Sequence, residues 1–380
     1  MLPLKNIRIL DLSEGLVCSL ATLYLSRFGA EVTKVENPDG DPVRRWGPWK
    51  GVESLYFQYL NGGKQSIVLN LETEAGREQF KRLLPRYDVL CVNDSEGRLE
   101  ALGLGYEALK VVNPDLIYAV YSYFGSEGPM RNRPGSSLVV QALGVAMDMT
   151  GVVGGPPIQS APSIAEHYAA GYLATGMLFA LIHKAQQGGG QRIDISLQDS
   201  IFSCIEAAPA ACSTVGEIHT RKGNFDPSCA PYDTFAVADG YVAVGVATQQ
   251  QWEKFCDVLG FEDLKSDPRF LTNEDRRTDY LEVLRPVLEA RMRGMGKLEV
   301  ESKCREQGIP CGAVLTVAEI TDMPNTAENG FLKTWEDPEA GTVRAPELPF
   351  ALSEDSARPH EKAPALGEHT QAVLSAAGRV

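Results

Sequence analysis

The chain has 380 residues, of which 44% are hydrophobic and 23% are charged, and its formal net charge is −14. This length and composition are typical of a globular protein with two domains, each with its own core. The acidic balance, without any cluster of Lys and Arg, argues against a nucleic-acid partner, because phosphate backbones favour clustered cations. No segment approaches the roughly 20 apolar residues of a membrane span, and the start of the chain lacks a signal-peptide pattern, so we expect a cytoplasmic protein without a membrane partner.

The eight cysteines are scattered along the chain, without paired short spacings and without histidines at ligand distances. We therefore expect reduced thiols and no metal site. Cys18 or Cys229 as a nucleophile is an alternative interpretation, but a free cysteine is far more often a small buried hydrophobic residue.

The first part of the chain alternates short β-type runs with helical ones. This pattern predicts a doubly wound, Rossmann-like α/β domain with a parallel sheet, whose ligands bind beyond the carboxyl ends of the strands. No phosphate loop is present, and the Gly-Leu-Gly at 103–105 lacks the third glycine of a dinucleotide fingerprint, so a nucleotide-dependent oxidoreductase is unsupported. The predicted strands span 7–11, 31–36, 66–69, 88–92 and 116–121, and the predicted helices span 16–28 and 73–84.

A long apolar stretch at 163–187 is dense in Ala and Gly. Small side chains let backbones approach closely, so we expect this helix to be buried against the sheet or against a second subunit. The glycines at 188–190 end it, and a strand at 192–197 and a helix at 199–211 are predicted to follow.

The composition shifts near 221–227, where a smaller domain is predicted to begin. An Asp-Gly turn at 239–240 between two alternating runs predicts a β-hairpin, and helical patterns follow. The predicted boundaries are 1–215 for the amino-terminal part of the large domain, 225–325 for the small domain, and 326–380 for a carboxyl-terminal segment that returns to the large domain.

Arg44 and Arg45 are adjacent in a loop after the second predicted strand. Two neighbouring guanidinium groups are suited to phosphate or carboxylate, so Arg44 is a candidate for binding an anionic cofactor. A solvated loop whose arginines pair with surface acids is an equally good interpretation.

A series of short motifs runs through nearly the whole chain in a fixed order. Each motif is weak alone, but in this order they resemble those of family III coenzyme A transferases, the CaiB/BaiF group. The motifs lie at 9–12, 29–36, 61–66, 69–71, 103–109, 113–114, 125–129, 141–142, 188–191, 238–241 and 366–370.

The resemblance implies a Rossmann-like large domain, a smaller inserted α+β domain, and two subunits interlocked like linked rings. It also implies transfer of coenzyme A between an acyl-CoA and a small carboxylic acid through a carboxylate nucleophile, without a metal. Leu69, Asn93 and Leu102 match family positions that line the coenzyme A path. Asn37 and Asp94 depart from the family pattern at this site, because the family often has Arg and an aromatic residue there.

The family's catalytic aspartate stands four residues before a glycine at the start of the small-residue helix. If that glycine is Gly171, the residue at the aspartate position is His167. Glu166 is the one nearby carboxylate, but it lies one helical step away, about 100° around the helix axis. It is a tentative nucleophile, and the alternative is an ordinary acid favoured by the helix dipole. A structural role is the alternative for His167.

The resemblance therefore leads to a first hypothesis of a subunit that lacks the catalytic aspartate. Its partner, in a heterodimer, would supply that residue, as in heteromeric members such as benzylsuccinate CoA-transferase. A self-sufficient homodimer that uses Glu166 and a noncatalytic CoA-binding scaffold are the alternatives. Racemase chemistry is disfavoured, because Ser136 and Ser137 stand where racemising relatives carry a histidine and an acid.

Overall fold

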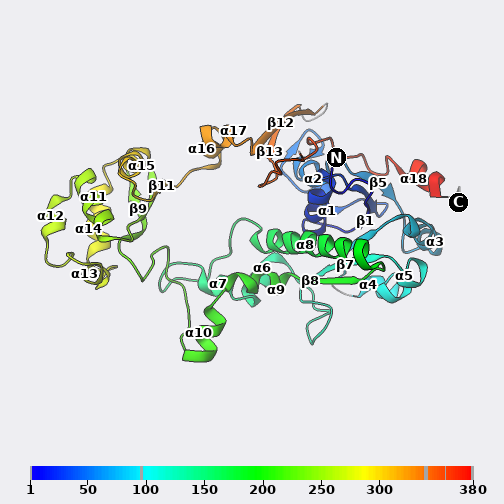
Figure 1. Ribbon diagram of the computed structural model, residues 1–380, viewed down its shortest axis with the longest axis horizontal. Coiled ribbons are helices and arrows are strands. Elements are labelled where there is room, and N and C mark those ends of the chain that lie inside the picture. Colours follow the sequence, from blue (N-terminus) through cyan, green and yellow to red (C-terminus); the bar gives the residue numbers. More distant parts are fainter. Residues whose placement is uncertain (1, 95–96, 338–340, 356, 378–380) are drawn as a thin grey trace. The chain divides into compact units, whose positions relative to one another are not determined.

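The computed structural model describes residues 2–94, 97–337, 341–355 and 357–377. Its contacts divide the chain into two compact units (Figure 1). The larger unit comprises Met1–Met149, Ile158–His219 and Glu328–Val380, and the smaller unit comprises Thr150–Pro157 and Thr220–Ala327. The predicted domain boundaries, 1–215, 225–325 and 326–380, stay a prediction.

The larger unit is built on a six-stranded sheet in which all pairs are parallel, in the order β5-β2-β1-β6-β7-β8. This confirms the predicted α/β class. Because β1 lies between β2 and β6, the chain proceeds outward from β1 in opposite directions, and the switch in direction falls between β1 and β6. The strands are β1 (Arg8–Leu12), β2 (Glu31–Glu36), β5 (Gln65–Val68), β6 (Val89–Asn93), β7 (Ile117–Ser122) and β8 (Arg192–Ser196).

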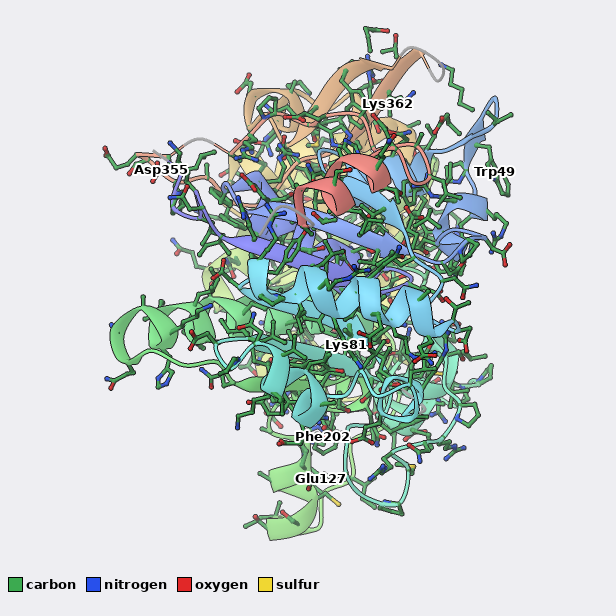
Figure 2. All side chains as sticks on the ribbon, turned by 90° about the vertical axis from the view of Figure 1, so that its right-hand side faces the viewer. Trp49, Lys81, Glu127, Phe202, Asp355 and Lys362 are labelled. Atoms are coloured by element: carbon green, nitrogen blue, oxygen red, sulfur yellow. The ribbon has the colours of Figure 1, made fainter. Side chains whose placement is uncertain are left out.

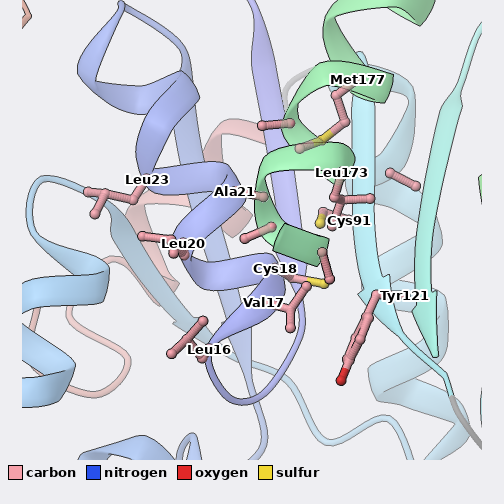
Figure 3. Packing of buried hydrophobic residues seen from close by; sticks show 14 of the residues in the cluster. Leu16, Val17, Cys18, Leu20, Ala21, Leu23, Cys91, Tyr121, Leu173 and Met177 are labelled. Carbon is pink, nitrogen blue, oxygen red and sulfur yellow. The ribbon is translucent and has the colours of Figure 1, made fainter. Parts of the chain in front are cut away.

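Both faces of this sheet are covered, which explains why its strands are continuously apolar. Ile9 faces one core cluster with Tyr121, and Leu10 faces the other with Tyr118. The alternation follows from the two-residue period of a strand. The first cluster includes α1 (Val17–Arg27) and α8 (Ile164–Gln187), which lie side by side on this face (Figures 1 and 3).

The other face is covered by α3 (Glu74–Leu83) and α5 (Tyr106–Val112). Thr73 caps α3, since its hydroxyl accepts a hydrogen bond from the amide of Gly76. In Figure 2, α3 crosses the face nearest the viewer and carries Lys81. The remaining elements of this part are β3 (Trp49–Lys50), β4 (Glu53–Ser54), α2 (Leu55–Asn61), α4 (Arg98–Ala101), α6 (Ser137–Leu143) and α7 (Ala146–Met149).

The predicted helix at 199–211 is wrong. The chain forms α9 (Leu197–Phe202), a short 3-10 turn, and then α10 (Ala208–Val215). Between them Glu206 adopts a left-handed backbone with φ of 47°, which ends a right-handed helix. Pro209 then lies in the first turn of α10, where its missing amide hydrogen costs nothing.

The smaller unit has a three-stranded antiparallel sheet, in which the predicted hairpin joins β9 (Tyr232–Val237) to β10 (Gly240–Gly245). Gly240 has a φ of 146°, a conformation that favours glycine. Helices cover a core that includes Phe235 and Trp252. The other elements are β11 (Cys311–Ala313), α11 (Gln249–Leu259), α12 (Glu262–Ser266), α13 (Asn273–Arg277), α14 (Leu284–Met292), α15 (Lys297–Glu306) and α16 (Val317–Thr321).

The carboxyl-terminal segment packs within the larger unit. After α17 (Pro324–Glu328), β12 (Leu332–Asp337) and β13 (Gly341–Pro346) form a hairpin that the sequence pattern did not reveal, and α18 (Thr370–Ala377) is the last helix. The amide of Arg358 donates to the carbonyl of Arg27, and that of His369 donates to Ser66. In Figure 2 this segment, marked by Asp355 and Lys362, lies beside elements near the amino terminus.

Candidate functional site

A cavity of about 110 Å³ lies at the carboxyl ends of β1, β2, β5 and β6. This is the edge of the sheet at which doubly wound folds bind ligands, and it includes the switch point between β1 and β6. Leu69, Asn93 and Leu102 line it, so the structure brings together three of the residues predicted to contact coenzyme A. The Asn93 side-chain oxygen accepts a hydrogen bond of 2.9 Å from the amide of Glu14, which ties the two strands at the switch point.

Arg44, the fourth predicted cofactor residue, is not among the residues that line this cavity. Its guanidinium donates two hydrogen bonds of 2.7 Å to Glu36 and one of 3.1 Å to the carbonyl of Pro364, and it lies 3.8 Å from the centre of the Phe57 ring. These contacts already occupy the guanidinium group. If Arg44 turned to a phosphate, Glu36 would lose its ion-pair partner and would keep only hydrogen bonds from the amide of Asp41 and the hydroxyl of Ser66. A role of Arg44 in coenzyme A binding stays a prediction.

The cavity is lined by more negative than positive groups. Among the described lining residues the one cationic side chain is Arg98, which forms an ion pair of 2.5 Å with Glu72, and both side chains are more than half exposed. Asp94 accepts hydrogen bonds from the amides of Arg98 and Leu99, and burial raises its pKa although these amides lower it. Of these lining side chains, Arg98 is therefore the one that could offset the negative charge of a bound polyanionic ligand. In the part of the chain that the structure describes, the carboxylates that line the cavity are those of Glu14, Glu36, Asp41, Glu72 and Asp94.

Two fully buried lysines support the loops that form the cavity. The Lys34 ammonium lies 2.8 Å from a carboxylate oxygen of Asp41 and donates a hydrogen bond of 2.8 Å to the carbonyl of Ser13. The Lys64 ammonium lies 3.2 Å from Asp11, whose other oxygen accepts a hydrogen bond from the Ser13 hydroxyl. The network thus joins the end of β1 to β2 and to the loop after β2.

The charges in this network are mutually dependent. Burial alone would raise the pKa of Asp11, but Lys34, Lys64 and two hydroxyl groups bring it down to about 2. Burial lowers the pKa of Lys64 to about 8, although Asp11 opposes the shift, whereas Asp11 and Asp41 hold the pKa of Lys34 above its usual range against the effect of burial. A lysine in the middle of a buried strand is a sequence signal that could have revealed this network.

Glu166 is in the first turn of α8, and its Oε2 atom is buried without a hydrogen-bond partner among the residues that the structure describes. Two tyrosines lie close enough to sense its charge. Burial raises the pKa of Tyr56 and that of Tyr121, and Glu166 adds to both shifts. An unpaired, water-shielded carboxylate oxygen is costly, so its presence beside two phenols is the most unusual polar feature of α8.

His167 is exposed, unlike the buried oxygen of Glu166. Its Nδ1 lies 2.7 Å from the carbonyl of Ser163, which is a hydrogen bond when Nδ1 carries the proton. The helix therefore directs the two neighbouring side chains to different environments, as its 100° step per residue requires. The catalytic roles of both residues stay predictions.

The register of α8 explains this difference. Its buried residues follow helical spacing from Ala165 and Ala169 through Leu173 to Met177. Glu166 precedes the buried Ala170 by four residues and Leu173 by seven, so it lies at the margin of the buried stripe. The pattern of buried residues in the sequence indicates where the Glu166 side chain points, whereas the spacing from Gly171 does not.

The amino terminus of α1 has free donors. Leu16, the capping residue, provides no side-chain hydrogen bond, and the amides of residues 16–19 have no hydrogen-bond partner in the described part of the chain. Figure 3 shows Val17 and Cys18 at this terminus beside Tyr121. Uncapped amides at the positive end of a helix can stabilise a developing oxyanion.

In the described ranges, no group of three or more His, Cys, Asp or Glu side chains is placed to hold a metal ion. All eight cysteines are free thiols. Among the helices that the structure describes, none has both the length and the apolar character to cross a membrane.

Comparison with known proteins identifies the family. The model of CoA-transferase family III matches residues 4–370. The chain belongs to CoA-transferase family III. It is therefore a member of a family of transferases, and the enzyme class expected from the motifs is confirmed.

Family III relatives are similar along almost their whole length. Acetyl-CoA:oxalate CoA-transferase of Acetobacter aceti is 33% identical over 377 residues, which cover 98% of this chain and 95% of the relative. Succinyl-CoA:glutarate CoA-transferase of Homo sapiens is 31% identical over 379 residues, covering 98% of this chain and 85% of the relative. The crystal structure of a CAIB/BAIF family protein from Brucella suis superposes with a TM-score of 0.91 at 31% identity, covering 99% of both chains.

Proposed function

We propose that this family III chain transfers coenzyme A from an acyl-CoA to a small carboxylic acid, with Glu166 as the nucleophile. The observation that carries the proposal is the buried, unpartnered Oε2 of Glu166 in an enzyme of this class. A carboxylate is the nucleophile that this double displacement needs. The substrates of the relatives, which include oxalate and glutarate by name, support small carboxylic acids as the acceptor class.

The reaction conserves atoms and involves no net oxidation. The Glu166 carboxylate attacks the acyl carbon of the thioester, the carbon–sulfur bond breaks, and a mixed anhydride and the coenzyme A thiolate are formed. The thiolate attacks the glutamyl carbonyl, which gives a glutamyl thioester and releases the donor carboxylate. The acceptor carboxylate attacks this thioester to form a second anhydride, and the thiolate then takes the acceptor acyl group and restores Glu166.

In this proposal the cavity binds the nucleotide part of coenzyme A, and the amino terminus of α1 contacts the thioester. The nucleotide part of coenzyme A lies in the cavity lined by Leu69, Asn93 and Leu102. The loop at 13–16 leads from this cavity to the amino terminus of α1, so the thioester extends along it. In this arrangement the free amides of α1 donate hydrogen bonds to the thioester oxygen, which becomes negatively charged when Glu166 attacks.

The oligomeric state is part of the proposal. Large apolar side chains of α8 are exposed, among them Tyr168, Leu178 and Phe179, of which Phe179 is 68% exposed. Exposed apolar surface of this kind is typical of an interface, and an interlocked second copy of the chain is the occupant that we propose. The alternative occupant is a related, aspartate-bearing chain, because His167 stands at the expected aspartate position. A cytoplasmic location belongs to the same proposal.

One set of experiments distinguishes a homodimer that uses Glu166, a heterodimer with an aspartate-bearing chain, and a noncatalytic scaffold. The chain is purified alone and incubated with an acyl-CoA and a carboxylic acid, intermediates are trapped with hydroxylamine or borohydride, and peptides are analysed by mass. We expect transfer and an adduct on Glu166, with activity lost in Glu166→Gln and largely kept in His167→Ala. Transfer without an adduct on Glu166 contradicts its role.

Absence of transfer by the chain alone, with activity restored by a co-purified aspartate-bearing chain, favours the heterodimer. If no assembly transfers coenzyme A, the noncatalytic interpretation is correct. Calorimetry against free coenzyme A then distinguishes a CoA-binding homologue, which releases or absorbs heat, from a scaffold that has lost the ligand, which does not.

A further inference from the structure

Tyr121 has a buried side chain whose hydroxyl makes no hydrogen bond with the described residues. It lies near the carboxyl end of β7 and is 7% exposed. The hydroxyl is not among the fully shielded polar atoms that lack a partner, so it remains accessible to solvent or to a ligand, although the ring is buried. Figure 3 shows its ring at the edge of the apolar cluster, with the oxygen pointing away from the labelled side chains.

Around Tyr121 lie further polar groups that have no hydrogen-bond partner among the described residues. Its ring contacts Tyr123 with centroids 6.1 Å apart, and Cys18, from the first turn of α1, is a neighbour. Glu166, with its unpaired oxygen, is close enough to influence the hydroxyl. A phenol, a carboxylate and free helix amides therefore lie at the same edge of the sheet. There the oxygen of a bound carbonyl group could accept hydrogen bonds from the phenol and the amides, while its carbon faces the carboxylate.

We propose that Tyr121 is a further catalytic residue, whose hydroxyl donates a hydrogen bond to the carbonyl oxygen of the acyl group that Glu166 attacks. This inference rests on the proposed function. As the carboxylate adds to the carbon, negative charge develops on that oxygen, and a nearby donor stabilises it. The proton stays on the tyrosine throughout.

The protonation state of Tyr121 suits this task. Burial raises its pKa well above the usual value, and Tyr123, Cys18 and Glu166 raise it further. The phenol is therefore a neutral donor at physiological pH and does not compete with Glu166 as a nucleophile.

The ring and the hydroxyl of Tyr121 have separable roles. The ring belongs to the core cluster with α1 and α8, whereas the hydroxyl contributes no internal hydrogen bond. Phenylalanine keeps the ring and removes only the donor. Since no pairing is lost, Tyr121→Phe should leave the stability of the fold unchanged, and a loss of rate would report on catalysis alone.

The matched control is Tyr118→Phe on the same strand. Tyr118 is 2% exposed and its hydroxyl also makes no hydrogen bond with the described residues, but its side chain faces the opposite side of the sheet. We expect Tyr121→Phe to lower kcat at least about tenfold, with KM for acyl-CoA changed less than about threefold, because the donor acts on the charge that develops in the transition state. Tyr118→Phe should leave both constants near those of the unmodified protein.

Steady-state kinetics in the assembly that transfers coenzyme A, with urea unfolding of each variant, test the inference. Wild-type kcat in Tyr121→Phe, or an equal loss in Tyr118→Phe, overturns it. Glu166→Gln is assayed alongside. Full activity of Glu166→Gln, or no transfer by any assembly, overturns the proposed function and this inference with it, whereas an inactive Glu166→Gln beside an unaffected Tyr121→Phe overturns the role of Tyr121 alone.

Discussion

At the scale of single residues, adjacent positions in one helix have very different chemical environments. Glu166 has a buried oxygen without a partner, and His167 is exposed with a hydrogen bond to its own helix. A one-residue change of register decides which of them faces the interior. The choice between them therefore depends on how α8 is rotated against the sheet, not on residue type.

Arg98 is predicted to be the charge contact of coenzyme A in the cavity. We expect Arg98→Gln to raise KM for acyl-CoA by up to about fivefold at low salt, because a single exposed charge pair contributes up to about 1 kcal/mol. Its partner substitution, Glu72→Gln, should lower KM by freeing Arg98. Steady-state kinetics in low and high salt check this. An effect of Arg98→Gln that does not shrink at high salt would contradict a Coulombic role.

At the scale of elements, buried charge links strands and loops that are far apart in the sequence. Lys34 in β2 contacts the carbonyl after β1 and Asp41 after β2, while Lys64 precedes β5 and contacts Asp11 in β1. Such pairs offset the cost of desolvation only when both partners are present. The network therefore fixes the loops around the cavity more than it adds net stability.

Breaking this network should be strongly destabilising. Lys34→Met leaves Asp41 buried without its cation, so we expect a loss of about 3–5 kcal/mol in the free energy of unfolding. The double variant Lys34→Met/Asp41→Leu should recover part of that loss, because no unpaired charge remains. Urea unfolding of Lys34→Met, of Asp41→Leu and of the double variant measures the coupling. A double variant that is as unstable as the sum of the single variants would contradict the pairing.

The carboxyl-terminal segment contains a pH-dependent contact. The His360 ring lies 3.9 Å from that of Trp335 in β12, and burial, helped by Arg27 against the effect of Glu347, lowers the pKa of His360 to about 4. The usual value in an unfolded chain is about 6.5. Between these pH values the unfolded chain binds more protons than the folded one, so stability falls as the pH is lowered through this window.

We expect this histidine to cost about 2 kcal/mol of stability when the pH is lowered from about 7.5 to about 5. His360→Phe removes the titrating group and should show a smaller dependence by that amount. Urea unfolding at both pH values, with the two proteins measured in parallel, gives the difference. Equal pH dependence in both proteins would mean that His360 does not titrate in this window.

At the scale of the whole molecule, the larger unit leaves apolar surface that a single chain does not cover. The exposed face of α8 is the main example, and Phe179 is its most exposed large side chain. Covering this face by a second chain is the assembly that we propose. Catalysis and assembly would then share one helix, since α8 also carries Glu166.

Phe179→Asp should weaken that assembly. A charge at the centre of an apolar interface must be desolvated, so we expect the variant to sediment as a smaller species than the unmodified protein at the same concentration. Ala185→Asp, at an exposed position near the end of the same helix, is the control for added charge. Identical sedimentation of Phe179→Asp and the unmodified protein would contradict an interface on this face.

The sequence by itself determined the α/β class and the positions of the sheet strands. The run at 31–36 predicted the bounds of β2, and the motifs led to the family, because apolar periodicity and turn residues act over a few positions along the chain. The hairpin of β12 and β13 and the break at Glu206 escaped prediction because their local patterns are weak.

The tertiary structure alone decided the arrangement of the candidate site. It turned Glu166 inward, paired Arg44 with Glu36, and placed the hydroxyl of Tyr121 without a partner near the start of α1. Each of these outcomes depends on contacts between segments distant in sequence. The direction of a side chain is set by the packing of its element against others, and no local pattern in the sequence specifies that packing.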